Sequence, residues 1–393
     1  MTRLDLSADT ARRALAPAGV EYDAEAARDR YATAVWCQLV EPGDSAAGRL
    51  IAARGAVGAL EAMLEGDPAE LTGRELAEGR KRWLPRLSAR AVSEALTAAA
   101  ARGVAFVTPA DADWPAQLDD LGAHAPLCLW VRGDVSALRR LEPSVAIVGA
   151  RAASRYGDHV AMELAAELAA SGVAIVSGGA YGIDGAAHRA TLAAGGLTVA
   201  LLAGGADRAY PAGHTKLLDD VAAHGVVLSE VACGAAPTKW RFLQRNRLIA
   251  ALAGATVVVE AGWRSGSLNT AGHAAALSRP LGAVPGPITS ATSAGTHRLI
   301  REYGAECITG ADDVREMLGL TESQPTGTTG HGYTDDATRV KDAMSTRVWR
   351  DTLEVARRAG MSTDAVEGIL GLLQLKGVID SGVDGWRLVR LGR

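Results

Sequence analysis

Six short apolar segments recur along the middle of the chain, separated by segments with helical spacing. The apolar segments are rich in Val, Ile, Leu and Ala, which is typical of strands buried on both faces of a sheet. The intervening helices are expected over about residues 156–170 and 215–223, and after Ile183, Lys239 and Ser267. This alternation predicts an α/β fold with a Rossmann-like, doubly wound, mostly parallel sheet. The six segments are SVAIVGA (144–150), VAIVSGG (173–179), LTVALLAGG (197–205), GVVLSE (225–230), TVVVEA (256–261) and PLGAVPG (280–286).

The pattern changes on both sides of this predicted sheet. Residues 1–100 are rich in Ala, Arg and Glu, and residues 23–40 and 46–64 have helical periodicity, with breaks at Glu41-Pro42-Gly43 and Pro85. We therefore expect an N-terminal helical domain over residues 1–100. The sheet domain is expected over residues 101–318, with short strands and turns in a lead-in over 101–143.

The C-terminal part is expected to form a third domain. Residues 319–336 are dominated by Gly, Thr and Pro with few apolar residues, which indicates a linker. Residues 337–393 read as three helices and a hairpin, with a turn at Gly360, an N-cap at Ser362 and a helix end at Gly377. Helices followed by a hairpin predict a winged-helix domain without a clearly basic face.

Composition restricts the class of protein. The chain has 393 residues, of which 48% are hydrophobic and 22% charged, as in an average soluble protein. The formal net charge is −4, so any nucleic-acid binding must come from a local cationic patch. Four cysteines occur singly without a CxxC pair, and no apolar run reaches the length of a membrane span. We expect a cytoplasmic protein that does not associate with membranes and holds no metal.

The carboxyl ends of the predicted strands carry residues suited to phosphate. In such sheets ligands bind beyond these ends, where glycines allow close approach of backbone N–H groups and helix N-termini favour anions. The candidate positions there are Arg151 and Ser154, Gly178 and Gly179, and the loop Ser265-Gly266-Ser267 with Asn269 and Thr270.

A cationic and aromatic stretch adjoins these strand ends. Residues 239–247 contain four cations and no carboxylate, with Trp240 and Phe242 between them. We expect this stretch to form a cationic loop, since four cations exceed what a mononucleotide needs and aromatic rings stack on bases of any sequence. The polar members of the stretch that we assign to the site are Lys239, Arg245, Asn246 and Arg247.

Enzymatic and cofactor-binding readings find less support. Neither G-x-G-x-x-G nor a G-x-x-x-x-G-K-[ST] loop is present, which argues against NAD and ATP. Asp184 and His188 lie four residues apart, which would suit an acid–base pair. The alternative is that Asp184 caps its helix while His188 packs against the sheet or forms a local hydrogen bond. Glu260 would serve either as a general base or as an acceptor that holds neighbouring groups in place. We expect no catalytic residue and no cofactor.

Several linked motifs together resemble the DNA-processing protein A (DprA, also called Smf) family. They occur in family order between about Asp113 and Gly304, with Leu243 where members often have proline and Asn269 where many have isoleucine or valine. The motifs are DWPAQLDDL, LWVRGD, VGARAASRYG, SGGAYGIDGAAHRATL, LAGGADRAYP, LSEVACGAAPTKWRFLQRNRLIAAL, VVVEAGWRSGSLNTAGHAA and AVPGPITS.

The resemblance implies a function without catalysis. Members bind single-stranded DNA, load the RecA recombinase onto it, displace single-strand-binding protein and dimerise through the Rossmann domain. Here the family's DNA contacts would fall on Arg151, Lys239, Phe242, Arg245, Asn246, Arg247 and Ser265 to Ser267, with Asn269 and Thr270 adjoining. The alternatives are a phosphoribohydrolase-like enzyme that processes nucleotides with Glu260, although PGPIT departs from that group's PGGxGT loop, and a winged-helix transcriptional regulator.

Overall fold

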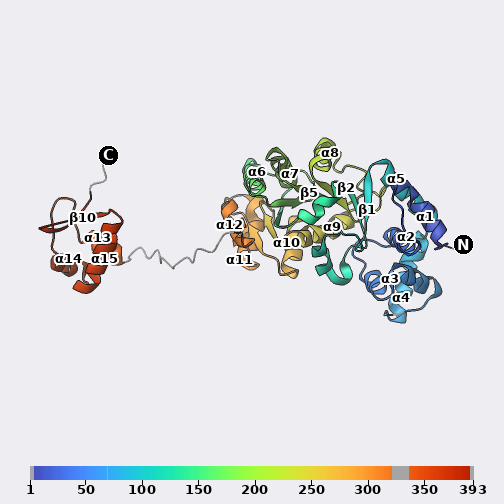
Figure 1. Ribbon diagram of the computed structural model, residues 1–393, viewed down its shortest axis with the longest axis horizontal. Helices are drawn as coiled ribbons and strands as arrows, with labels where there is room; N and C mark the ends of the chain where they lie inside the picture. The colour runs from blue at the N-terminus through green and yellow to red at the C-terminus, as the bar shows by residue number, and fades with distance from the viewer. Residues whose placement is uncertain (1–3, 69, 321–335, 390–393) are drawn as a thin grey trace. The chain divides into compact units, whose positions relative to one another are not determined.

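The computed structural model describes residues 4–68, 70–320 and 336–389. The chain divides into two compact units, Met1–Leu320 and Thr321–Arg393 (Figure 1). Most of the linker predicted over residues 319–336 lies outside the described residues. Each unit is therefore considered by itself.

A nine-stranded sheet organises the first unit. Its strand order is β1-β2-β6-β5-β4-β3-β7-β8-β9, and all pairs from β6 to β9 are parallel, whereas β1–β2 and β2–β6 are antiparallel. The predicted mostly parallel sheet is thus confirmed. Strand β9 was not predicted from the sequence, because it has two exposed residues and no apolar run. The strands are β1 (Val104–Val107), β2 (Leu129–Gly133), β3 (Ser144–Val148), β4 (Ala174–Ser177), β5 (Thr198–Leu202), β6 (Val226–Ser229), β7 (Ala255–Val258), β8 (Leu281–Ala283) and β9 (Glu306–Cys307).

Helices cover both faces of this sheet. Along β3, Val145 and Ile147 belong to one core, while Ala146 and Val148 belong to the core on the opposite face. This alternation explains why each central strand is apolar throughout. The first face carries α6 (Arg155–Ala170), α7 (Ile183–Ala193), α8 (Thr215–His224) and α12 (Ala311–Met317), and the second carries η3 (Ala116–His124), α9 (Lys239–Leu252), α10 (Ser267–Ala276) and α11 (Ala294–Glu302).

The strand order reverses direction between β3 and β7. From β3 the chain proceeds outward through β4, β5 and β6, and α9 then returns it to β7 on the other side of β3. The loops that leave β3 and β7 therefore diverge to opposite sides and open a crevice at the carboxyl ends of the strands. This is the place where ligands bind in open α/β sheets.

The N-terminal helices pack against one edge of the same sheet. Their core contains Trp36 and Trp83, whose ring centroids lie 5.3 Å apart in an edge-to-face contact. The same core includes Cys128, which directly precedes β2, and Trp130, which lies on β2. Figure 1 shows these helices gathered beside β1 and β2. They are α1 (Ala8–Leu15), α2 (Ala24–Leu39), α3 (Ser45–Glu65), α4 (Gly73–Trp83) and α5 (Ala89–Ala101), with short 3₁₀ turns η1 (Ala16–Ala18) and η2 (Leu84–Arg86).

Residues 336–389, the described part of the second unit, contain three helices and a two-stranded hairpin. Helix α14 ends at Gly360, which has a φ of 63°, and the side chain of Ser362 accepts a hydrogen bond from the backbone N–H of Ala365 to begin α15. Val355, Val366 and Leu370 lie in its own small core. The elements are α13 (Asp336–Asp342), α14 (Thr352–Ala359), α15 (Thr363–Leu375), β10 (Ile379–Gly382) and β11 (Gly385–Leu388).

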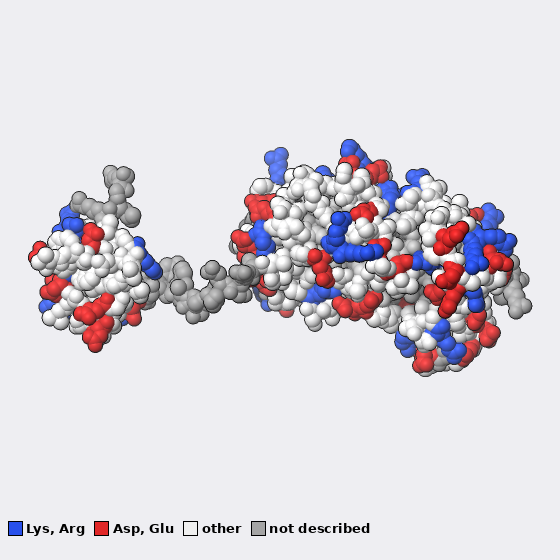
Figure 2. Space-filling model, viewed as in Figure 1, with Lys and Arg blue, Asp and Glu red and all other residues white. Residues whose placement is uncertain are grey.

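Charge of both signs is mixed on the face that Figure 2 shows. On the face shown in Figure 2, Lys and Arg are interspersed with Asp and Glu rather than gathered in one broad field. On this face a nucleic-acid site would have to depend on a few placed cations rather than on a broad basic surface. Among the described residues, no helix is both long and apolar enough to cross a membrane.

The contact between α3 and η3 supplies a test of the fold. A Cβ added at Gly48 would overlap the backbone carbonyl of Ala123, whereas one added at Gly58 of the same helix would make an ordinary contact with Arg54. We expect Gly48→Ala to lower the free energy of unfolding by about 1–3 kcal/mol through overpacking. The matched variant Gly58→Ala should be neutral or stabilising by up to about 1 kcal/mol. Urea unfolding of both variants measures this, and equal effects would contradict the close contact.

Candidate functional site

A cleft of about 790 Å³ lies at the crevice between the β3 and β7 loops. Its walls come from residues 148–152 after β3, residues 262–267 after β7, and the first turns of α9. The site predicted at the strand ends therefore coincides with a real cavity at the reversal of strand order.

The cleft brings together most of the predicted site residues. Those that line it are Arg151, Lys239, Phe242, Arg245, Asn246, Ser265, Gly266, Ser267 and Thr270. Five others do not belong to its lining: Ser154, Gly178, Gly179, Arg247 and Asn269. The contacts of four of these residues are described below, and the fifth, Gly179, has its backbone carbonyl 3.0 Å from Nδ1 of His214.

The cationic stretch is a helix rather than the expected loop. Helix α9 begins at Lys239, and the side chain of Thr238 caps it by accepting a hydrogen bond from the backbone N–H of Arg241, 3.2 Å away. Helical geometry distributes the cations around the axis, so they cannot all face one ligand. The helix expected after Lys239 is confirmed, and the prediction of a cationic loop over the same residues was wrong, because the cap at Thr238 starts the helix at Lys239.

Arg245 points into the sheet beneath the cleft. It is 7% exposed, and its Nη1 donates to the backbone carbonyls of Gly178 and Leu201 at 2.6 and 2.5 Å. Burial lowers the pKa of Arg245 to about 10, and the nearby Asp184 carboxylate opposes this shift. The guanidinium remains protonated at neutral pH and forms a positive floor to the cleft, held by the carbonyl of Leu201 on β5 and that of Gly178 directly after β4.

Arg247 faces away from the cleft. Its two terminal nitrogens donate to the two carboxylate oxygens of Glu230, each at 2.7 Å, and its Nε donates to the carbonyl of His124 at 3.0 Å. The side chain is 3% exposed. Arg247 was predicted to belong to the DNA site, and the structure corrects this placement, because its charge is already neutralised by the buried carboxylate of Glu230.

Arg241 connects α9 to the N-terminal helices. Its Nε and Nη2 donate to the two carboxylate oxygens of Glu41 at 2.9 and 3.0 Å, and Glu41 also pairs with Arg86. Burial alone would raise the pKa of Glu41, but the hydrogen bonds and charges of Arg241 and Arg86 lower it below its usual value. Arg241 is therefore also occupied.

The cations that remain at the mouth of the cleft are Arg151, Lys239 and Arg264. All three are exposed, and none of them forms an ion pair with another described residue. The guanidinium of Arg151 lies over the ring of Phe242, 4.8 Å from its centroid, in a cation–π contact. These groups are free to meet an anion, and Phe242 already fixes the position of one of them.

The Ser265-Gly266-Ser267 loop forms another part of the wall. The Ser265 and Ser267 hydroxyls lie 2.8 Å apart, directly at the start of α10. Asn246 of α9 donates from its side-chain amide to the carbonyl of Gly266 at 3.3 Å and to the side chain of Asn269 at 3.2 Å. Asn246 and Asn269 thus hold the loop against α9, and the positive end of α10 faces the cleft with Thr270 in its first turn.

Glu260 holds the loop after β3. It is 2% exposed; one carboxylate oxygen accepts from the backbone N–H of Ser154 at 2.8 Å, and the other accepts from the hydroxyls of Ser154 and Thr292 at 2.7 and 2.9 Å. Ser154 in turn caps α6 by accepting from the N–H of Gly157. The interpretation of Glu260 as a structural acceptor is confirmed, and Ser154 shares that role.

Asp184 and His188 do not form a pair. Asp184 accepts from the backbone N–H groups of Gly178 and Ala180, at 3.1 and 3.4 Å, so it holds the loop after β4 rather than capping its own helix. Burial raises the pKa of Asp184, with Arg245 opposing. His188 is fully buried against Thr198, 2.7 Å away, and burial lowers its pKa to about 3. The expected packing role of His188 is confirmed.

Two aromatic residues beside the cleft were not predicted from the sequence as part of the site. Tyr210 lines the cleft with its ring centroid 5.5 Å from that of Phe242, and it comes from a loop with no apolar or basic pattern. Trp263 is 57% exposed between two lining residues, and the Arg298 guanidinium lies 5.0 Å from its ring centroid. The Gly-Trp-Arg string before Ser265 was the available signal for Trp263.

A cleft at the reversal point of a doubly wound sheet is typical of the α/β proteins whose ligands bind beyond the carboxyl ends of the strands. A family profile described as DNA recombination-mediator protein A matches residues 105–319. The chain belongs to this family of DNA recombination mediators, the DprA/Smf proteins.

Individual relatives agree with this membership. A Mycobacterium tuberculosis protein named as a DNA processing protein DprA is 42% identical over 372 residues, which cover 90% of this chain and 93% of the relative. The Streptococcus pneumoniae DNA processing protein DprA is 41% identical over 190 residues, 48% of this chain and 66% of the relative. The X-ray structure of the Streptococcus pneumoniae protein has 30% sequence identity and a TM-score of 0.60, and the match covers 73% of this chain and 97% of that chain.

The placement of Arg247 leads to a stability prediction. Arg247→Met should lower the free energy of unfolding by about 3–5 kcal/mol, because it leaves the Glu230 carboxylate buried without its cation. The double variant Arg247→Met/Glu230→Gln should recover part of the lost free energy of unfolding. Urea unfolding of the two single variants and the double variant, analysed as a double-mutant cycle, measures this recovery.

The control is the exposed pair of Arg90 and Glu94, with side chains 88% and 63% exposed. Arg90→Met should leave the free energy of unfolding unchanged within error. If the effects of the two substitutions at positions 230 and 247 simply add, the buried pair does not carry the stability we assign to it.

Proposed function

We propose that the strand-end cleft binds the backbone of single-stranded DNA and that the protein loads RecA onto that strand during recombination and natural transformation. The observation that carries the proposal is the set of three unpaired exposed cations, Arg151, Lys239 and Arg264, around a cleft with an aromatic wall. Cations that form no ion pair with another described residue, together with aromatic rings, are the two components of a site that tracks a single strand.

Phosphate groups have several partners in this cleft. Arg151 and Lys239 neutralise phosphates at the mouth, while the buried Arg245 adds positive potential from below. The serine hydroxyls and the first N–H groups of α10 donate to a further phosphate, where the helix dipole also favours an anion. The spread of these groups over three separate segments favours a chain of phosphates over one mononucleotide.

Base contact involves Phe242 together with Arg151. Because the Arg151 guanidinium lies 4.8 Å from the Phe242 ring centroid, an incoming base meets an arginine plane supported by an aromatic ring. Bases stack on guanidinium planes as well as on aromatic rings, without regard to sequence. Exposed Trp240 and Trp263 near the same cleft offer further stacking surfaces, with exposed fractions of 55% and 57%.

The contacts of the acidic residues argue against the nucleotide-processing alternative. Both oxygens of Glu260 accept hydrogen bonds from Ser154 and Thr292, and Asp184 holds two backbone N–H groups. A general base needs access to the substrate proton it removes. These carboxylates instead fix the loops that present the cations.

The partners in this proposal are RecA, single-strand-binding protein and a second copy of the chain. The resemblance to the family carries these assignments, and a homodimer would bring two clefts to one strand. In the second unit, three helices and a hairpin are the parts of a winged helix. Its α15 exposes Leu372 and Leu375, 60% and 86%, which favours contact with protein over reading of a duplex sequence.

Binding should prefer single strands and depend on salt. We expect labelled oligo-dT to bind more tightly than a duplex of equal length, with a loss of roughly 0.7 log units of affinity per phosphate contact for each tenfold rise in salt. Lys239→Ala should weaken binding and reduce this slope by nearly one contact, and Arg151→Ala/Lys239→Ala should abolish tight binding. Fluorescence anisotropy at several salt concentrations measures each quantity.

The matched control is Lys216→Ala, which removes an exposed lysine of α8 that pairs with Asp220. It should bind oligo-dT as the unchanged protein does. Tight binding by the Arg151→Ala/Lys239→Ala protein would exclude the cleft, and preference for one duplex sequence would favour a winged-helix regulator.

Loading of RecA is a separate test. On single-stranded DNA covered with single-strand-binding protein, we expect the unchanged protein to shorten the lag before RecA hydrolyses ATP. The Arg151→Ala/Lys239→Ala variant should leave the lag as long as it is without the protein. If the protein binds oligo-dT tightly and the lag is still unchanged, the loading function is wrong while the binding function stands.

A further inference from the structure

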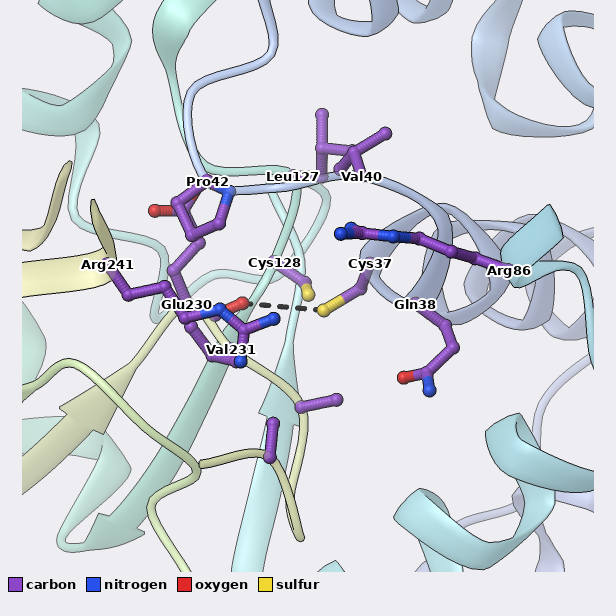
Figure 3. Close-up of a pocket in the computed structure, with 12 residues that line it drawn as sticks. Cys37, Gln38, Val40, Pro42, Arg86, Leu127, Cys128, Glu230, Val231 and Arg241 are labelled. Atoms are coloured by element: carbon purple, nitrogen blue, oxygen red, sulfur yellow. Dashed lines mark hydrogen bonds between the residues drawn. The ribbon is translucent and has the colours of Figure 1, made fainter. Parts of the chain in front are cut away.

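A second cavity, of about 330 Å³, lies where the N-terminal helices meet the edge of the sheet (Figure 3). Gln38, Val40, Pro42 and Arg86 contribute to one side of this cavity, and the segments around Leu127 and Glu230 to the other. It is outside the strand-end cleft, and the proposed function does not use it. Two thiols line it, one from each side of the seam.

The two thiols belong to Cys37, on α2, and Cys128, immediately before β2. Figure 3 shows their sulfur atoms facing one another across the seam. The Cys37 thiol donates to the backbone carbonyl of Glu230 at 3.4 Å, and its sulfur accepts from the indole N–H of Trp130 at 3.3 Å. Single cysteines with no CxxC spacing gave no sign of this pairing, because the fold alone brings them together.

The surroundings give the two thiols different acidities. The neighbouring Cys128 thiol and the Trp130 N–H lower the pKa of Cys37, although burial opposes them. Burial raises the pKa of Cys128 well above its usual value, and the charge of Cys37 raises it further. A thiolate is the reactive form of cysteine, so Cys37 is the more nucleophilic member of the pair.

We propose that Cys37 and Cys128 form an oxidative modification site, at which hydrogen peroxide converts the facing thiols into a disulfide that joins the N-terminal helices to the sheet. Three observations carry this: the thiols face each other, they come from opposite sides of the seam, and an adjoining cavity admits a small oxidant. In a reducing compartment such bonds are transient and respond to the oxidant level.

The reaction balances with peroxide as the oxidant. The Cys37 sulfur attacks one oxygen of hydrogen peroxide, the O–O bond breaks, and the hydroxide that leaves takes up the proton lost by Cys37 to give water. The Cys128 sulfur then attacks the resulting sulfenic acid and displaces its hydroxide, which leaves as a second water with the proton of Cys128. Two thiols are oxidised by two electrons, and one peroxide is reduced.

The experiment treats the reduced full-length protein with hydrogen peroxide, alkylates the remaining thiols after denaturation, and analyses intact mass and peptides. We expect a Cys37–Cys128 linked peptide, two fewer alkylated thiols, a mass loss of about 2 Da before alkylation, and full reversal by dithiothreitol. In Cys128→Ser, dimedone should trap the Cys37 sulfenic acid, since the resolving thiol is gone.

The matched control is Cys307→Ser, which removes the exposed cysteine of β9 and should leave the Cys37–Cys128 peptide unchanged. An unmodified Cys37 after peroxide treatment, or a link from Cys37 to Cys233 or Cys307 instead, would overturn the proposal. The peptide analysis of the unchanged chain and of Cys307→Ser decides this without a substitution at the seam. Thermal unfolding of the oxidised protein should occur at a higher temperature than that of the reduced protein.

Discussion

The rest of the structure depends on the hydrogen bonds and ion pairs that the desolvated arginines of α9 form with acceptors inside the chain. A guanidinium removed from water is costly unless its N–H groups find acceptors and its charge finds a partner. Arg245 finds strand carbonyls, Arg247 finds Glu230, and Arg241 finds Glu41. One helix is thereby attached to the sheet, to the end of β6 and to the N-terminal helices at the same time.

This arrangement separates structural charge from functional charge. The arginines that the helix turns inward have their partners within the chain, so the local positive potential at the mouth of the cleft comes from Arg151, Lys239 and Arg264. A few free cations in a concave site focus the potential on an anionic ligand even when the net charge of the chain is −4. The buried carboxylates Glu260 and Asp184 act on the backbone and hold the loops in position.

The sequence was sufficient for the parallel centre of the sheet and for the location of the cleft, but not for the short edge strand β9. Continuous apolar strands such as SVAIVGA, separated by helical segments, predict a doubly wound sheet, and its strand ends predict the cleft. What could not be predicted is the direction of each side chain in residues 239–247. Whether Arg247 faces a ligand or Glu230 depends on where α9 begins and on tertiary contacts with segments far away in the sequence. Tyr210 and the facing thiols were missed for the same reason.

Glu230 connects the cleft with the seam between the N-terminal helices and the sheet. Its backbone carbonyl accepts from the Cys37 thiol, and its carboxylate holds Arg247 of the helix that also carries Lys239 and Phe242. Coupling between two sites requires an element whose position both of them influence. The segment after β6 meets this requirement. A change in the bonding of Cys37 removes its hydrogen bond to the Glu230 carbonyl, which is one of the contacts that hold this segment in place. The N-terminal helices are therefore part of the framework of the cleft rather than an appendage to the sheet.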